Sequence, residues 1–207
     1  VVEGNLDVIS SHQVGLKQVV ATAGTAMTEH HLKSLSRLTR NIRLCFDGDK
    51  AGVAATERAI PIAEAVGVDL SVITLPSDFK DPDELIKKDE KLWQSVIDSH
   101  QPAIEWVIEQ YSERYDLTTA TGKRELSTQA LTIIRSIKDP VEQEHYLGRV
   151  AEVTGASRRA LEGKLNIAPR EPARRLKPMI VTQSDGHDPD VHQDYLLGLA
   201  VMDETTQ

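Results

Sequence analysis

Hydrophobic and polar positions in the first part of the chain follow two different periods. Short apolar runs with the length and β-branched content of buried strands occupy residues 1–2, 18–22, 42–46 and 70–75. Helical periodicity fills the gaps, at residues 5–12, 28–39 and 52–65. Pro61 is expected to interrupt or kink the last of these helices. Because strands separated by helices pair in parallel, the pattern predicts an α/β domain with a central parallel sheet.

Strand signals vanish after Pro82. Helices are expected at residues 82–88, 90–98, 101–114, 122–136, 139–153 and 157–165. Four prolines and scattered charges at residues 168–190 are typical of a linker. A short amphipathic helix is expected over residues 191–202. The predicted organisation is an α/β domain at 1–89, an all-α subdomain at 90–166, a Pro-containing linker at 167–190 and a terminal segment at 191–207.

Charge is unevenly distributed along the 207 residues, whose formal net charge is −8. Residues 1–116 contain 12 Lys/Arg and 19 Asp/Glu, residues 117–178 contain 12 and 7, and residues 179–207 contain none and 6. An acidic first half suits divalent cations, and the basic middle suits phosphates. For most of these charges, however, solvated helix faces are the preferred interpretation. No apolar run is long enough to cross a membrane, and no signal peptide is recognisable.

The single cysteine, Cys45, excludes an internal disulfide and a cysteine-cluster zinc site, and it fits the reducing cytosol. Cys45 lies inside an expected strand, so a place in the core is the simplest interpretation. The chain opens without Met, in an apolar run, and we expect it to be a piece cut from a longer protein.

Acidic residues follow the carboxyl ends of the expected strands. They are Glu3 after the first strand, Asp47 and Asp49 after the third, and Asp81 and Asp83 after the fourth. Ligands gather beyond the carboxyl ends of parallel strands, so these carboxylates are expected to face one crevice. Such crowding raises pKa values unless cations neutralise it. Hard oxygen ligands of this kind favour Mg²⁺ or Mn²⁺, and two such ions can assist phosphoryl transfer.

Each acid also has a structural interpretation. The Asp-Gly pair that begins at Asp47 is a common turn dipeptide. Asp81 is followed by a proline, and this pair is a favourable helix N-terminus with Asp81 as the N-cap. Considered by itself, Asp81 is therefore best explained as a capping residue. Asp7 is open to interpretation as an exposed helical acid. Gly24 by itself only permits a tight turn. The order of these signals, rather than any one of them, carries the functional interpretation.

That order resembles the TOPRIM domain shared by bacterial primases, topoisomerases and related nucleases. The glutamate of that domain corresponds to Glu3 and its Asp-x-Asp pair to Asp47 and Asp49. The resemblance to bacterial replicative primases of the DnaG type is closer, and Asn5 stands where an aromatic residue is usual. It extends over about residues 1–166, with the matching segments at residues 1–9, 23–26, 46–52, 75–85 and 139–146.

The resemblance implies a site. It makes Glu3, Asp47 and Asp49 catalytic, with Glu3 serving as acid/base or metal ligand beside the reacting 3′-hydroxyl. It implies two or more Mg²⁺ or Mn²⁺ ions that hold the triphosphate of the incoming nucleotide. The implied metal-binding set is Glu3, Asp7, Asp47, Asp49, Asp81 and Asp83. Lys50 is a candidate for neutralising the negative charge of the phosphates, although a simple exposed lysine at a helix start explains it equally well. Gly24 and Thr25 form the family's glycine turn.

The resemblance also implies partners: a single-stranded DNA template, ribonucleoside triphosphates and an RNA primer. Residues 191–207 resemble the start of the helicase-binding domain, so the replicative helicase is an expected partner through the rest of that domain. An amphipathic end helix explains the same residues equally well. The family's zinc module and basic template-tracking subdomain are not recognisable here, so we expect the isolated chain to be weak or inactive. The implied location is the bacterial cytoplasm, at the replisome.

Two alternatives remain open. A topoisomerase or TOPRIM nuclease would use the same metals to cleave nucleic acid, but the context of Asp81 and the helices after it argue against cleavage. The other alternative is a non-catalytic fragment that docks the helicase through its linker and last helix. The leading prediction is the metal-binding part of a DNA primase, a DNA-directed RNA polymerase that acts by nucleotidyl transfer.

Overall fold

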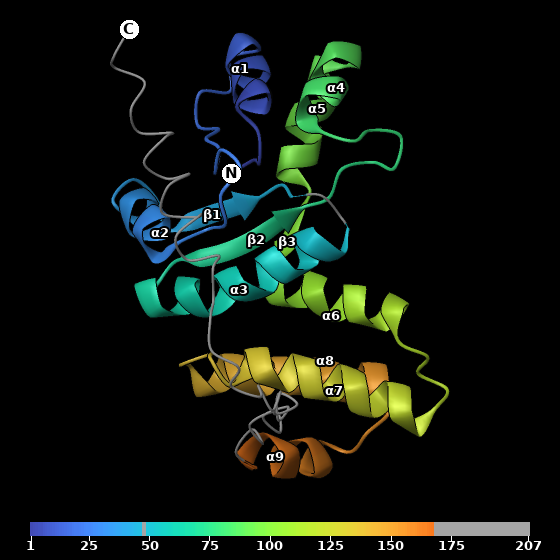
Figure 1. Cartoon of the computed structure of the whole chain (residues 1–207). Coiled ribbons are helices and arrows are strands. Elements are labelled where there is room, and N and C mark those ends of the chain that lie inside the picture. Colours follow the sequence, from blue (N-terminus) through green and yellow to red (C-terminus); the bar gives the residue numbers. More distant parts are fainter. Residues whose placement is uncertain (47–48, 168–207) are drawn as a thin grey trace, which may run out of the picture. The chain divides into compact units, whose positions relative to one another are not determined.

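A short sheet lies at the centre of the first half of the chain (Figure 1). The structure is a computed structural model, and it describes residues 1–46 and 49–167. Strands β1 (Asn41–Leu44) and β2 (Asp69–Ile73) pair in parallel. The three-residue strand β3 (His100–Pro102) joins the other edge of β2 in antiparallel orientation. The parallel pairing of the two longer strands confirms the predicted α/β fold.

The first two expected strands form only single bridges. Val2 pairs in parallel with both Ala21 and Cys45, so it continues the sheet beyond β1. The expectation that strand structure ends at Pro82 is wrong, because β3 follows it. The sequence of β3, which includes His100 and Pro102, shows no strand periodicity. These residues are extended because they pair with the free edge of β2.

Helices surround the sheet and follow it in sequence. Their bounds are α1 (Asn5–Gln13), α2 (Glu29–Ser36), α3 (Lys50–Val66), α4 (Pro82–Lys88), α5 (Glu90–Asp98), α6 (Ala103–Arg114), α7 (Ala120–Ile134), α8 (Pro140–Thr154) and α9 (Arg158–Asn166). The helices predicted within the described residues therefore all form, with ends displaced by at most three residues. Helix α3 is continuous through Pro61, so the predicted interruption there is wrong. Packing of both ends of α3 outweighs the one hydrogen bond that a proline cannot donate.

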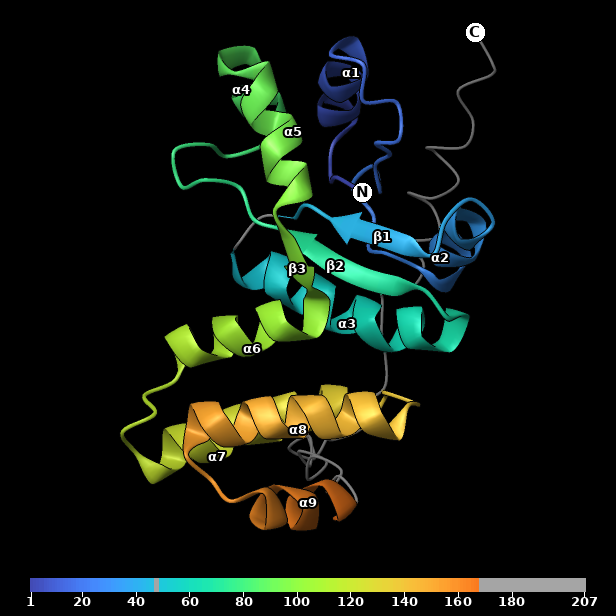
Figure 2. The same cartoon turned by 180° about the vertical axis from the view of Figure 1, so that it is seen from behind.

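The two faces of the sheet contact different helices (Figures 1 and 2). Helices α1, α4 and α5 lie on one side, and α3 and α6 lie on the other. Successive residues of β2 point to opposite faces, so Ile73 packs with Leu85 and Trp93, whereas Val72 packs with Val53 and Val107. Both faces are thus buried, as a parallel sheet requires.

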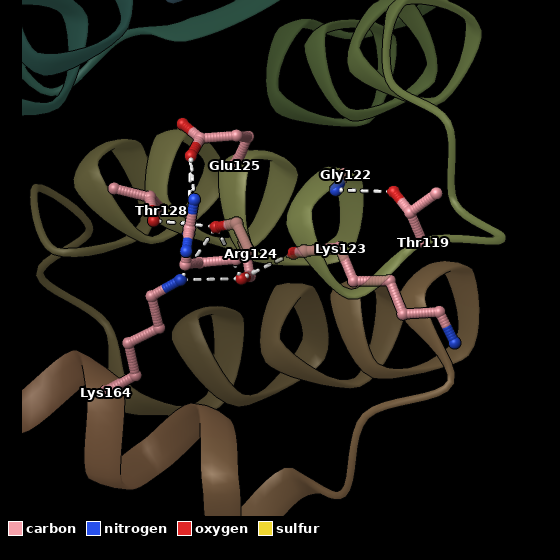
Figure 3. Close-up of polar contacts among 8 residues, drawn as sticks. Thr119, Gly122, Lys123, Arg124, Glu125, Thr128 and Lys164 are labelled. Carbon is pink, nitrogen blue, oxygen red and sulfur yellow. Dashed lines mark hydrogen bonds and ion pairs between the residues drawn. The ribbon is translucent and has the colours of Figure 1, made fainter.

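Helices α6 to α9 form the helical region that the sequence predicts. Its core is continuous with the α3 side of the sheet. Polar bonds join its helices as well: Lys164 of α9 donates to the carbonyl oxygen of Arg124 at 2.9 Å and to Ser127 Oγ at 2.7 Å (Figure 3). In return, Arg135 at the end of α7 donates to three carbonyl oxygens at the end of α9. The linker at 168–190 and the segment at 191–207 lie outside the described residues.

None of the helices that the structure describes is long and apolar enough to cross a membrane.

Candidate functional site at the acidic end of the sheet

Glu3 and Asp49 line one surface hollow of about 290 Å³. Val2 is held by bridges to Ala21 and Cys45, which places Glu3 at the carboxyl end of the sheet. Asp49 stands at the start of α3, after β1. One wall of the hollow comes from residues 22–27 and the other from one face of α3. Two acids that are distant in sequence therefore meet where a parallel sheet positions its ligands.

The expected glycine turn forms the wall of the hollow at residues 22–27. Gly24 has φ +78° and Ala23 has φ 54°, so two consecutive residues adopt the left-handed region. The hydroxyl of Thr25 closes the turn by donating to the carbonyl oxygen of Thr22 at 2.7 Å. A Cβ at Gly24 would meet no atom within 4 Å, so the backbone conformation rather than space favours glycine here.

Asp49 is the N-cap of α3. Its Oδ1 atom accepts hydrogen bonds from the amides of Ala51 and Gly52, each at 2.8 Å. Both bonds use the same oxygen, so neither capping bond uses Oδ2. Lys50, the first residue of α3, is exposed, and its proposed phosphate role stays a prediction. Asp47 lies outside the described residues.

The other predicted metal ligands form a second acidic group. Asp7 on α1 and the residues that open α4 lie side by side, because Asp7 Oδ1 accepts from the amide of Asp83 at 3.2 Å. Asp7 Oδ2 accepts from the amide of Gly4 at 3.1 Å. The carboxylates of Asp81 and Asp83 are close enough to act on the pKa of Asp7. The hollow around Glu3 contains none of these three acids, and the Gly4 amide connects the two groups.

Asp7 is 7% exposed, so the interpretation as an exposed helical acid is wrong. Burial raises the pKa of its carboxyl, and the hydrogen bonds from the amides of Asp83 and Gly4 partly oppose that rise. Its backbone oxygen accepts from the hydroxyl of Ser11 at 2.6 Å, and Ser11 accepts from Trp93 of α5 at 3.1 Å. Asp7 thus joins the starts of two helices beneath the site.

Asp81 and Asp83 already have partners within the protein. Asp81 Oδ1 accepts from the amide of Glu84 at 2.8 Å, which confirms the predicted N-cap. Asp83 accepts from the hydroxyl of Ser10 and from Lys87 Nζ, the latter at 2.6 Å. These bonds hold the pKa of Asp83 below its ordinary value, with Lys87 as the main cause. Within residues 1–46 and 49–167, no three His, Cys, Asp or Glu side chains are arranged to hold a metal ion.

Three hollows meet at Asp49, and among the cations that line them only Lys50 was named from the sequence. Arg58 lines the hollow that contains Glu3. Lys80 lines a second hollow of about 270 Å³, and Lys50 and Arg114 line a third of about 220 Å³. Arg58 was detectable in principle, because it repeats at helical spacing from Ala51 and Ala55. Arg114 was not, because only the packing of α6 on α3 brings it there.

Comparisons with known proteins match two parts of the chain to two family models. A family model described as Toprim-like, a metal-binding domain type, matches residues 1–86. A second model, the DnaB-helicase binding domain of primase, matches residues 104–159. That match lies on α6–α8 rather than on the terminal segment at 191–207, for which helicase contact was expected.

Individual relatives point the same way. The DNA primase of Clostridium acetobutylicum is 33% identical over 162 residues, which are 78% of this chain and 27% of that protein. A DNA primase domain from Pseudomonas aeruginosa superposes with a TM-score of 0.65 at 35% identity, and the match covers 79% of this chain and 52% of that one. A DnaG primase catalytic domain bound to single-stranded DNA has a TM-score of 0.65 at 29% identity, with 77% and 52% covered.

The chain spans about a quarter of the length of the curated relatives that it matches. Within that span the Toprim-like model covers the two longer strands, helices α1 to α3 and most of α4, and the helicase-binding model covers most of the helical region. The chain therefore belongs to the DnaG-type DNA primases, in which it corresponds to the Toprim domain and the helices that follow it.

Proposed function

We propose that this chain supplies the metal-binding half of an active site that joins ribonucleotides into an RNA primer on single-stranded DNA. The observation that carries the proposal is the meeting of Glu3 and Asp49 in one hollow beside the Gly24 turn. Cleavage of nucleic acid, as by a topoisomerase or nuclease with the same domain type, is the competing function. The context of α4 and the helices after it favours primer synthesis.

The donor set fits divalent cations. Carboxylate oxygens are the ligands that Mg²⁺ and Mn²⁺ prefer, and Asp49 Oδ2 is free of the helix-capping bonds. Glu3, Asp47 and Asp49 would hold the ions nearest the reaction, and Asp7, Asp81 and Asp83 would serve as the further acids of the set. When bound, two such ions neutralise developing charge on the phosphoryl oxygens.

The chain's own residues have distinct tasks in this proposal. Glu3 projects into the hollow and accepts the proton of the attacking 3′-hydroxyl. Asp49 is oriented by the amides of α3, so its free oxygen has a fixed direction. The turn at Gly24 and Thr25 bounds the space for the nucleotide. Asp7 fixes α1 against α4 and so positions Asp83.

The first test is metal binding by the 207-residue chain. Mn²⁺ is expected to raise the melting temperature of the parent chain, and Asp49→Asn is expected to reduce the gain. Asparagine retains a capping oxygen, so the loss reports a missing charge rather than a missing cap. Asp89→Asn is the matched control, because Asp89 caps α5 through the same two-amide pattern. Equal gains in Asp49→Asn and the parent would contradict the site.

The second test is activity of the full-length protein that contains this chain. It should synthesise short RNA on single-stranded DNA in the presence of Mg²⁺, and Glu3→Gln should abolish synthesis while leaving the melting temperature nearly unchanged. Nicking of supercoiled DNA without primer synthesis would instead support the cleavage function. We place this activity in the bacterial cytoplasm, at the replisome.

We also propose that the helical region contacts the replicative helicase, since residues 104–159 match the helicase-binding family. Val141 near the start of α8 is 78% exposed, so its side chain is accessible to a partner protein. The division of the chain at 89/90 stays a proposal. The packing of Trp93, Val96 and Ile97 against the sheet favours a boundary nearer residue 102.

Helicase binding can be located by two variants. Val141→Glu should weaken binding of the helicase from the same bacterium if the helical region makes the contact, whereas Gln129→Glu on exposed α7 surface should not. A chain that ends at residue 190 tests the terminal segment. Loss of binding in that shortened chain alone would move the contact to residues 191–207.

A further inference from the structure

Arg58 occupies a distinctive place on α3. The face of α3 that lines the hollow with Glu3 presents Ala51, Gly52 and Ala55, and then Arg58. Positions 51, 55 and 58 share one helix face because of the 3.6-residue period. Three small residues leave the hollow open, and the first large side chain along this face is a cation.

Arg58 has no competing partner in the part of the chain that the structure describes. It is exposed, and it forms no ion pair or hydrogen bond with the described residues. The neighbouring Glu57 is directed elsewhere, to the hydroxyl of Tyr111 on α6. By contrast, Arg135 and Arg149 are both committed to carbonyl or carboxylate oxygens. The guanidinium of Arg58 is therefore available to a ligand in the hollow.

The charges in the hollow are separated along its length. Asp49 stands at the N-terminal end of α3, and Arg58 follows it by nine residues, about 13.5 Å along the helix axis at 1.5 Å per residue. Among the described residues that line this hollow, Arg58 is the only cation. This polarity fits a ligand whose anionic groups extend away from a metal-binding end. A guanidinium is well matched to phosphate oxygens because its planar donors form paired hydrogen bonds.

We propose that Arg58 binds the polyphosphate of the incoming ribonucleoside triphosphate at the end of the hollow opposite Glu3 and Asp49. The proposal rests on the proposed primase function. The phosphate that reacts lies beside the acids, and the outer phosphates lie along the small residues of α3 toward Arg58. Arg58 is then a substrate-binding residue that distinguishes triphosphates from monophosphates.

The test measures dissociation constants of ATP and AMP with Mg²⁺ for the 207-residue chain by calorimetry. Arg58→Ala should weaken ATP binding about 10- to 100-fold, the range for losing hydrogen bonds to a charged group, and should change AMP binding less than about twofold. Arg58→Lys should recover part of the loss, because it restores the charge without the paired geometry. Arg159→Ala, an exposed arginine of α9, is the control for removing one positive charge.

The outcomes separate this inference from the proposed function. Equal weakening of ATP and AMP, or no change in either, in Arg58→Ala overturns the role of Arg58. If ATP binding still requires Mg²⁺ and Asp49, as tested with Asp49→Asn, the proposed function survives that result. ATP binding that is independent of Mg²⁺ and Asp49 rejects the proposed function instead. No ATP binding by the parent chain at millimolar concentration rejects both.

Discussion

At the scale of single residues, a glycine permits one close backbone contact in the helical region. Gly122 lies in the first turn of α7, where its amide donates to the N-cap Thr119 at 3.0 Å (Figure 3). A Cβ at Gly122 would overlap the backbone carbonyl of Asp116, with the carbonyl carbon only 2.6 Å away. The chain before α7 folds back over its first turn, and only glycine permits that approach.

Gly122→Ala should therefore destabilise the protein, by about 1–3 kcal/mol or more, because backbone cannot move aside as a side chain can. Urea unfolding followed by circular dichroism measures the change. Gly163→Ala in α9 is the matched substitution, since no atom lies within 4 Å of the added Cβ. It should stabilise the protein by about 0.5–1 kcal/mol through helix propensity. Similar effects of the two substitutions would contradict the assigned contact.

At the scale of elements, Asp81 has a structural role that is separable from metal binding. As N-cap of α4 it accepts from the amide of Glu84, and α4 carries Asp83 beside Asp7. A serine at position 81 retains a capping oxygen and removes the negative charge. The pair of substitutions Asp81→Ala and Asp81→Ser therefore distinguishes the cap from the ligand.

Asp81→Ala should lower the free energy of unfolding by about 1 kcal/mol, and Asp81→Ser should lower it by much less. If Asp81 is also a ligand, both variants lose part of the increase in melting temperature that Mn²⁺ causes in the parent. Retention of the full increase in Asp81→Ser would limit Asp81 to capping. Thermal unfolding with and without Mn²⁺ provides both measurements.

At the scale of the whole described chain, the sheet and the helical region share one core. Val53 and Ile60 of α3 and Val72 of β2 pack in the same cluster as α6, α7 and α8. The residues that the structure describes accordingly all lie in one compact unit. We therefore expect the sheet and the helices to unfold together, because unfolding of either one would expose the cluster that they share.

The two tryptophans test this cooperativity, because they lie in different hydrophobic clusters on opposite sides of the sheet. Trp93 is buried among α1, α4 and α5, and Trp106 is buried on the helical side. Trp93→Phe leaves Trp106 as the only tryptophan, and Trp106→Phe leaves Trp93. In each variant, fluorescence and circular dichroism should give the same urea midpoint. A midpoint from fluorescence that differs from that of circular dichroism would mean that the two regions unfold separately.

The contact between α8 and the sheet also predicts a pH dependence. Glu142 lines a hollow of about 430 Å³ together with Glu64 and Asp69. Partial burial raises the pKa of Glu142, and the carboxylates of Glu64, Asp139 and Asp69 raise it further. A raised pKa in the folded state means that ionisation favours the unfolded state. Stability is therefore lost as the pH rises from the ordinary glutamate range through the folded-state pKa.

Glu142→Gln should remove this loss. The melting temperature of Glu142→Gln should exceed that of the parent at pH 7. The two should be the same near pH 3.5, where the Glu142 carboxyl of the parent is protonated in both the folded and the unfolded state. Glu162→Gln on the exposed surface of α9 should change neither value appreciably. The same increase at both pH values would assign the effect to packing instead of charge.

The amino-acid sequence by itself determined the helices, the two longer strands and the order of the acidic segments. Local signals suffice for these features: helical periodicity spans a dozen residues, and the cap at Asp81 and the turn at Gly24 depend on neighbours within four positions. The family resemblance could be identified for the same reason, since its motifs are short and ordered.

Only the tertiary structure decided which of those residues meet. It made His100–Pro102 a strand by offering the edge of β2, and it buried Asp7 where the sequence allowed exposure. It placed Glu3 with Asp49 and Arg58, and it separated them from the Asp7 group. The physical reason is that burial and charge proximity depend on contacts between distant segments, which the packing of α3 and α6 on the sheet supplies and which no local period encodes.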